Sequence, residues 1–84
     1  MAFILLLKPK ARKNLDNLGD HDRAKVGLVL DAIREDPFSG KKLHGKYAGH
    51  YSVYAWPFRI LYEIKKHELI ILVLKIRHRK DAYK

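Results

Sequence analysis

Two groups of cationic side chains stand near the end of the chain, separated by an apolar run. Arg59 lies inside the otherwise mostly apolar segment Phe58–Ile64, and the cluster Arg77-His78-Arg79-Lys80 follows a second apolar segment. Burying an arginine without an anionic partner is costly. The planar guanidinium group binds phosphate through paired, charge-assisted hydrogen bonds. We therefore expect a phosphate of another molecule to be the partner of these arginines.

Histidine and tyrosine accompany the arginines. His78 can gain or lose a proton near neutral pH, which fits a general acid or base. Tyr54 and Tyr83 can stack on unpaired bases, the usual mode of single-stranded RNA recognition. Two other interpretations stay open, because Arg59 can pair with Glu63 on the same strand face and the tyrosines can be packing residues. The residue types favour an RNA site without deciding it.

The charge is concentrated in the second half of the chain. The 84 residues carry a formal net charge of +9. Residues 1–40 hold seven Lys/Arg and six Asp/Glu, a net of +1, whereas residues 41–84 hold eleven and three, a net of +8. Such a basic half fits nucleic acid or an acidic protein as partner, or simply a solvated surface. The length predicts one domain spanning residues 1–84.

Composition also indicates which site types to expect least. The chain has no cysteine, and His44, His50 and His67 lack the spacing of a metal site. We therefore expect no metal and no cofactor. The apolar run Phe3–Leu7 is too short to cross a membrane and lacks the pattern of a signal peptide. The expectation is a cytoplasmic protein that does not act at a membrane.

The N-terminal half predicts a strand followed by two helices. Residues 1–7 are apolar without alternation, which predicts a strand with both faces covered or paired. Pro9 suits the first turn of a helix, and an apolar stripe follows up to Gly19, which is typical of a helix end. Asp20 or Asp22 can cap a second helix, which Asp36-Pro37 ends. The second stripe consists of Val26, Val29, Leu30 and Ile33.

The C-terminal half predicts three consecutive strands, at residues 51–56, 58–64 and 69–74. Alternation places the apolar residues of the middle strand toward the helices and Arg59 on the opposite, open face. Short connections predict an antiparallel meander. The fold class is therefore α+β, in the order β-α-α-β-β-β, with a helical hairpin on one face of an antiparallel sheet. Residues 38–48 read as a basic loop, either a phosphate-contacting arm or an ordinary loop.

Four segments together resemble the RelE/ParE superfamily of toxin–antitoxin toxins, and the tail is most similar to RelE-type mRNA interferases. The resemblance covers nearly the whole chain in order, spacing and length. Its segments are Lys42-Leu43-His44-Gly45, Gly49–Tyr54, Phe58–Ile64 and Lys75–Tyr83. The resemblance implies a RelE-like fold similar to microbial ribonucleases, a cognate antitoxin, and cleavage of mRNA in the ribosomal A site without a metal.

The resemblance also implies roles for individual residues. Arg59 and Arg79 match the family's strand and tail arginines and would stabilise phosphoryl charge, while Tyr83 matches its C-terminal tyrosine and His78 its tail histidine. These four are the expected catalytic residues. The RNA-binding residues that we expect are Lys41, Lys42, Lys46, Ser52, Tyr54, Arg77 and Lys80. Further expected partners are mRNA on the ribosome, with 16S rRNA contacts, and operator DNA through the antitoxin complex.

Two departures from the RelE pattern keep other functions open. RelE-type enzymes often carry basic residues where this chain has Ser52 and Tyr54, and a glycine where it has Arg77. One alternative is a ParE-type toxin that inhibits DNA gyrase. Another is a catalytically impaired member that only binds its antitoxin.

Overall fold

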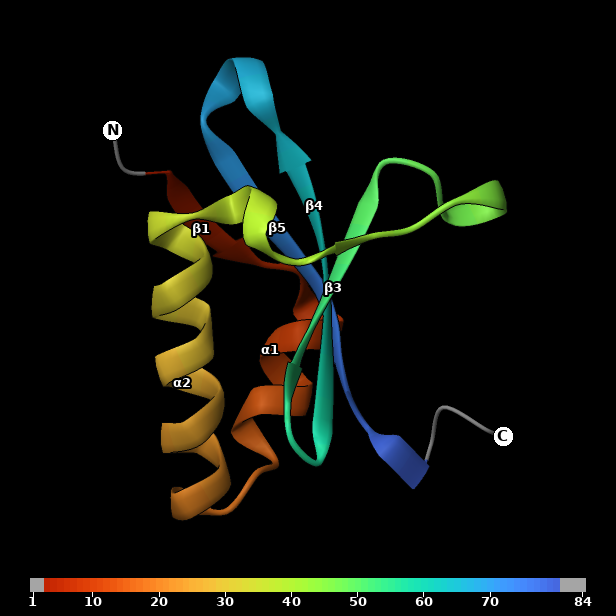
Figure 1. The fold of residues 1–84 in the computed structure, drawn as a ribbon. Helices are drawn as coiled ribbons and strands as arrows, with labels where there is room; N and C mark the ends of the chain where they lie inside the picture. Colours follow the sequence, from red (N-terminus) through yellow and green to blue (C-terminus); the bar gives the residue numbers. More distant parts are fainter. Residues whose placement is uncertain (1–2, 81–84) are drawn as a thin grey trace.

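Two helices cover one face of a five-stranded sheet in the computed structural model, which describes residues 3–80 (Figure 1). Three single-turn 3₁₀ helices join these elements, at Pro37–Ser39, Gly45–Tyr47 and Lys66–Glu68. The predicted α+β class, with a helical hairpin on one face, is confirmed. None of the helices in this part of the chain is long and apolar enough to cross a membrane. The main elements are β1 (Ile4–Leu7), α1 (Pro9–Asp16), α2 (Asp20–Glu35), β2 (Lys41–Lys42), β3 (His50–Ala55), β4 (Phe58–Lys65) and β5 (Ile70–His78).

The strands lie in the order β1-β5-β4-β3-β2. The antiparallel meander of β3, β4 and β5 is as predicted. The sheet is mixed rather than wholly antiparallel, because β1 pairs in parallel with β5. The segment predicted as a basic loop contains a further strand, β2, which pairs with β3 at the edge. Strand β5 also runs on to His78, beyond the predicted end at Leu74.

The core lies between the helices and the covered sheet face. From α2 the side chains of Val26, Leu30 and Ile33 are buried, as their helical spacing predicts. They meet the buried face of β4, where Ile60 and Tyr62 are fully buried. Each large apolar side chain that leaves water contributes about 1.5–3 kcal/mol. This packing leaves the opposite sheet face uncovered by helices and free to carry a site.

The structure refines two details of the predicted N-terminal half. Ile4 and Leu6 are 60% and 46% exposed, so one face of β1 is not covered, although the strand is paired with β5. The helices cover one face only, and β1 is an edge strand. The N-cap of α2 is Gly19, without a side-chain cap. Asp20 and Asp22 instead lie in the first turn, where a carboxylate interacts favourably with the helix dipole.

A buried tyrosine fixes the connection between α2 and the sheet. The Tyr62 hydroxyl donates a hydrogen bond to the carbonyl oxygen of Pro37, 2.7 Å away. Burial is the main reason that the pKa of Tyr62 lies above its ordinary value, so the hydroxyl stays protonated and remains a donor. The bond holds the 37–39 turn against β4 and thereby sets where β2 begins.

Asn14 of α1 completes the hydrogen bonding of β5 beyond the end of β1. Its Oδ1 accepts a hydrogen bond from the backbone N–H of Ile76 at 3.1 Å. Asn14→Ala leaves this partly buried N–H without its acceptor, which costs about 1–3 kcal/mol. We expect a lower urea midpoint with an unchanged slope. Asn17→Ala, at the exposed end of the same helix, is the control, and equal midpoints for the two variants would contradict this role.

Candidate nucleic-acid interface

The open face of the sheet carries a row of three side chains from three adjacent strands. Tyr54 of β3 pairs with Arg59 of β4, and Arg59 pairs in turn with Arg77 of β5. Directly opposed residues project from the same face of a sheet. The next row along the strands on this face consists of Ser52, Leu61 and Lys75. The expectation that Arg59 projects from the open face is confirmed.

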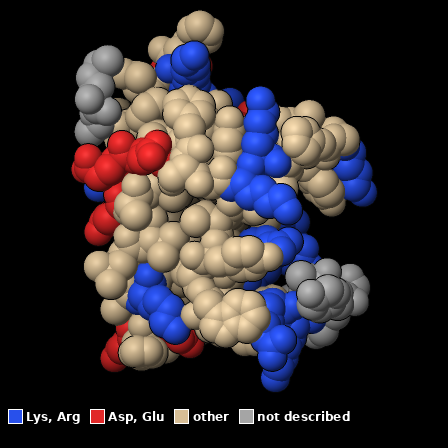
Figure 2. Space-filling model, viewed as in Figure 1, with Lys and Arg blue, Asp and Glu red and all other residues tan. Residues whose placement is uncertain are grey.

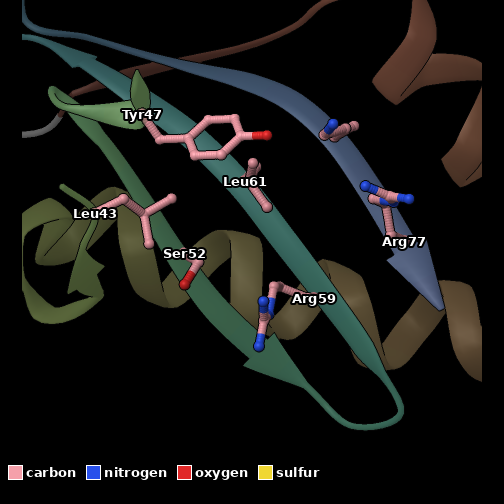
Figure 3. Close-up of a pocket in the computed structure, with 7 residues that line it drawn as sticks. Leu43, Tyr47, Ser52, Arg59, Leu61 and Arg77 are labelled. Carbon is pink, nitrogen blue, oxygen red and sulfur yellow. The ribbon is translucent and has the colours of Figure 1, made fainter. Parts of the chain in front are cut away.

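All members of the two rows except Tyr54 line a cavity of about 280 Å³ (Figure 3). Ser52, which is only 5% exposed, lies on its β3 side and Arg77 on its β5 side. Among the described residues, three of the lining side chains are cationic and none is a carboxylate. The arrangement therefore suits an anion. The lining residues are Leu43, Tyr47, Ser52, Arg59, Leu61, Lys75 and Arg77.

Tyr54 holds the guanidinium group of Arg59. Nη2 of Arg59 donates a short hydrogen bond to the Tyr54 hydroxyl, and the guanidinium carbon lies 4.9 Å from the centre of the tyrosine ring. The alternative pairing with Glu63 is not seen, because the ion pairs recorded within residues 3–80 both lie on α2. Arginine has five N–H donors, so donors remain for a ligand. Tyr54 itself is 55% exposed and accessible for stacking.

Arg77, rather than Arg79, lies beside Arg59. The backbone N–H of Arg79 donates to the Pro57 carbonyl oxygen at 2.8 Å, and its guanidinium carbon lies 5.2 Å from the centre of the Trp56 ring. Arg79 therefore lies at the β3–β4 turn and does not line the cavity. The reason is that β5 extends to His78 and its register with β4 shifts between Leu61 and Tyr62, which brings residue 77 opposite Arg59 on the open face.

His78 lies on the opposite face of the sheet. It pairs with Phe58, and its ring packs edge-on against the buried Phe58 ring, with centroids 5.3 Å apart. Its Nδ1 accepts the backbone N–H of Lys80 at 3.1 Å. His78 therefore does not line the cavity with Arg59 and Arg77, because adjacent strand residues project from opposite faces.

Comparison with known proteins identifies the family. Residues 5–83 match the family model described as "ParE toxin of type II toxin-antitoxin system, parDE". The chain belongs to the RelE/ParE superfamily of type II toxin–antitoxin toxins. The toxin is 33% identical over 86 residues to Toxin RelG from Mycobacterium tuberculosis, an alignment that covers 100% of this chain and 99% of that protein.

Solved structures confirm the fold of the toxin. The RelBE2 toxin–antitoxin complex from Mycobacterium tuberculosis contains a chain with a TM-score of 0.87 at 25% identity, covering 94% of this chain and 100% of that one. The isolated RelE toxin from E. coli has a TM-score of 0.80 at 20% identity, covering 98% of this chain and 96% of that one. The RelE–RelB complex from Pyrococcus horikoshii contains a chain with a TM-score of 0.77 at 20% identity, covering 94% of this chain and 97% of that one.

The four lysines that were predicted to bind RNA do not line the cavity. Lys41 and Lys42 are exposed on the edge strand β2, and the Lys46 ammonium lies 5.2 Å from the centre of the Tyr47 ring. Lys80 is exposed just after β5. Tyr83 lies outside the described residues.

The sequence prediction missed four of the described lining residues, Leu43, Tyr47, Leu61 and Lys75, of which Lys75 alone is charged. Lys75 lines the cavity from β5, opposite Leu61 of β4. The signal was present, because Lys75 and Arg77 alternate with the apolar Ile76. A strict two-residue period from the buried Ile71 and Val73 would nevertheless have turned both cations toward the helices, and it is the register shift between β4 and β5 that puts them on the open face.

Charges of opposite sign gather on opposite sides of the toxin. In Figure 2 most of the visible lysine and arginine atoms lie on the side away from α2, whereas acidic side chains lie on the side of α2. A surface that is mainly positive attracts a polyanion and orients its approach. Within residues 3–80 no group of three potential metal ligands comes together.

Proposed function

We propose that this toxin is a ribosome-dependent endoribonuclease that cleaves mRNA in the A site without a metal ion. The observation that supports this most strongly is the Arg59–Arg77 pair on the open sheet face, in a cavity whose charged lining residues within residues 3–80 are all cations. Two guanidinium groups side by side match the oxygens of one phosphodiester. The similarity to Toxin RelG and to RelE structures supports the same assignment.

The reaction uses the substrate's own 2′-hydroxyl group. Its oxygen attacks the adjacent phosphorus, the bond from phosphorus to the 5′ oxygen breaks, and the products are a 2′,3′-cyclic phosphate and a 5′-hydroxyl. Negative charge builds up on the phosphoryl oxygens in the transition state. Arg59 and Arg77 stabilise this charge from a preorganised position, which is often the largest single contribution to catalysis.

Proton transfer is the smaller part of the proposed mechanism. The Tyr54 oxygen accepts a hydrogen bond from Arg59, so its own proton can be donated to the leaving 5′ oxygen. No histidine of residues 3–80 lines the Arg59–Arg77 cavity, and we propose that the 2′-hydroxyl proton passes to water. Tyr83 keeps its proposed stacking role on the strength of the resemblance, and Arg79 beside Trp56 contacts the neighbouring RNA backbone.

A cognate antitoxin is the proposed protein partner. Solved complexes pair related toxins with antitoxins in Mycobacterium tuberculosis and Pyrococcus horikoshii. The remaining proposed partners are mRNA on the ribosome, the surrounding 16S rRNA, and operator DNA through the antitoxin complex. Lys41, Lys42, Lys46 and Lys80 are the proposed contacts to RNA outside the cavity.

The second candidate function is inhibition of DNA gyrase. The match to the ParE toxin family model favours it, and so does the absence of a histidine from the cavity lining. A third possibility is a catalytically impaired member that retains only antitoxin binding, which fits Ser52 and Tyr54 at positions that are often basic in RelE-type enzymes.

One experiment distinguishes these functions. The purified toxin is added to a cell-free translation reaction, the 5′ ends of the mRNA are mapped, and gyrase supercoiling is assayed in parallel. We expect cuts at codon spacing that require translating ribosomes, and no effect on gyrase. Gyrase inhibition without cuts would replace the proposal with the second function, and no effect in either assay would favour the third.

His78→Ala tests the proposed absence of histidine catalysis. Because the ring packs on Phe58 away from the cavity, we expect cleavage within about threefold of wild type, well short of the loss caused by removing a general acid or base. The thermal midpoint should fall slightly through the lost ring contact. A hundredfold loss of cleavage by a folded variant would return His78 to the catalytic residues.

A further inference from the structure

A second cavity adjoins the first on the open face. It has a volume of about 440 Å³, within the range of roughly 300–1,000 Å³ that is typical of small-ligand sites. Tyr47, Leu61 and Lys75 line both cavities, so the two are neighbours along one groove. The residues that line only the second cavity are Lys8, Lys10, His50, Glu63 and Leu74.

We propose that this second cavity binds another nucleotide of the same RNA strand and selects guanine through Glu63. This inference rests on the proposed nuclease function and names a subsite for it. Arg59 and Glu63 are four residues apart on β4, about 13 Å along a strand. A phosphate held by Arg59 therefore cannot reach Glu63, and a nucleotide further along the strand is the occupant that fits.

The cationic side chains of the second cavity bind the phosphate of this nucleotide. Lys8 and Lys10 come from the start of α1, and Lys75 comes from β5. No ion pair is recorded for any of the three within residues 3–80. Lysine binds phosphate as a point charge with little directional demand. These side chains therefore supply affinity for the RNA backbone without reading its sequence.

Affinity for phosphate does not explain why Glu63 lines this cavity. A carboxylate in a groove lined by lysines repels a polyanion, and no ion pair recorded in the described part of the chain neutralises it. An ionised carboxylate accepts hydrogen bonds but cannot donate them. The ligand that fits this carboxylate is therefore the edge of a base that carries hydrogen-bond donors. Guanine offers two adjacent donors, N1–H and the 2-amino group, which one carboxylate can accept together, whereas uracil, cytosine and adenine do not.

The aromatic residues of the cavity provide the stacking surface. Tyr47 is 44% exposed, and its ring centre lies 6.5 Å from that of His50. His50 is the cross-strand partner of Glu63, so both side chains lie on the open face. Stacking on such a ring accepts any base and contributes about 1–3 kcal/mol per base in known complexes. Tyr47 therefore holds the base, and Glu63 determines which base is preferred.

The test uses short oligoribonucleotides that carry 2′-O-methyl groups and cannot be cleaved. Fluorescence anisotropy compares a tetrauridine background containing one guanine, inosine or adenine at each position. We expect the guanine oligonucleotide to bind about tenfold more tightly than the adenine one at one position, since a bidentate contact discriminates by about 1–3 kcal/mol. Inosine, which lacks the 2-amino group, should fall between them.

Substitutions assign the preference to its residue. Glu63→Gln should reduce the preference for guanine to less than twofold, whereas Glu35→Gln at the end of α2 should leave it unchanged. Replacing Lys8 and Lys10 with alanine should weaken all sequences alike. Each lost phosphate contact reduces the steepness of log affinity against log salt by about 0.7, so the loss of two contacts should reduce it by about 1.4. Lys66→Ala, at a position that lines neither cavity, is the matched control.

The outcomes separate this inference from the nuclease proposal. Equal affinity for all bases in the wild-type protein, or a guanine preference that survives Glu63→Gln, would overturn the subsite even if mRNA cleavage is confirmed. A preference that depends on Glu63, in a protein that cuts no mRNA, would support the subsite and overturn the nuclease. The wild-type comparison of bases needs no variant, so a folding defect cannot obscure it.

Discussion

Replacing Arg59 and Arg77 together with alanine is expected to abolish mRNA cleavage in a translation reaction and to leave the fold intact. Both side chains lie on the open face, where no helix packs. Removing one preorganised donor from a developing oxyanion typically lowers the rate about 10²–10³-fold. We expect a loss of that size for each single variant and no detectable cuts for the double variant.

The controls separate charge from geometry. Replacing Arg12 and Arg34 with alanine removes the same charge from the helices and should leave cleavage within a few-fold of wild type. Arg59→Lys keeps the charge but loses the planar fork, so its activity should lie between wild type and Arg59→Ala. Circular dichroism melts check that each variant is folded. Undiminished cleavage by the double variant would refute the assignment of the site.

A comparison of Arg77→Ala with Arg79→Ala decides which of these two arginines stabilises the phosphoryl group together with Arg59. The resemblance assigns the second catalytic arginine to Arg79, whereas the structure sets Arg79 against Trp56 at the β3–β4 turn and Arg77 beside Arg59. If Arg77 stabilises the phosphoryl group, Arg77→Ala should lower cleavage more than Arg79→Ala does. The reverse order would mean that the end of β5 rearranges when RNA binds.

Periodicity explains what the sequence could predict. The two-residue period of a strand placed Arg59 on the sheet face opposite to that of Phe58, Ile60 and Tyr62. The structure confirms this, because those three side chains are buried. The same rule could not place His78, because the register between β4 and β5 shifts between Leu61 and Tyr62 and the alternation along β5 changes phase there. Ile71 and Val73 are buried before the shift and Ile76 after it. Strand β5 continues because Lys75 and Arg77 alternate with Ile76, and this alternation puts the histidine on the helix side.

Contacts between distant segments explain what could not be predicted. The two-residue strand β2 has no periodicity of its own and exists because β3 offers it an edge. Asn14 and Ile76 lie 62 residues apart in the chain, and no local pattern marks them as partners. The second cavity likewise combines the start of α1 with β3, β4 and β5. Its volume depends on how these elements pack, which composition and spacing do not specify.

Gly40→Ala is expected to cause the largest loss of stability among single conservative changes in the loop before β2. The backbone at Gly40 has φ −73° and ψ 172°, which any residue adopts, so the need for glycine comes from space alone. A β-carbon there would overlap the Tyr62 hydroxyl and lie 2.9 Å from the Ser52 carbonyl oxygen. Overpacking of this kind costs typically about 1–3 kcal/mol, a large share of the roughly 4–13 kcal/mol of an 84-residue domain.

A double-mutant cycle measured by urea unfolding identifies the cause of this loss. Tyr62→Phe alone should destabilise by about 1–3 kcal/mol, because it leaves the buried Pro37 carbonyl without its donor. Combined with Gly40→Ala it should cost less than the sum of the two, since the atom that the new methyl group overlaps is gone. Gly27→Ala, in open space within α2, should instead stabilise by about 0.5–1 kcal/mol. Additive costs in the cycle would mean that the Ser52 carbonyl, and not the tyrosine, excludes a side chain at residue 40.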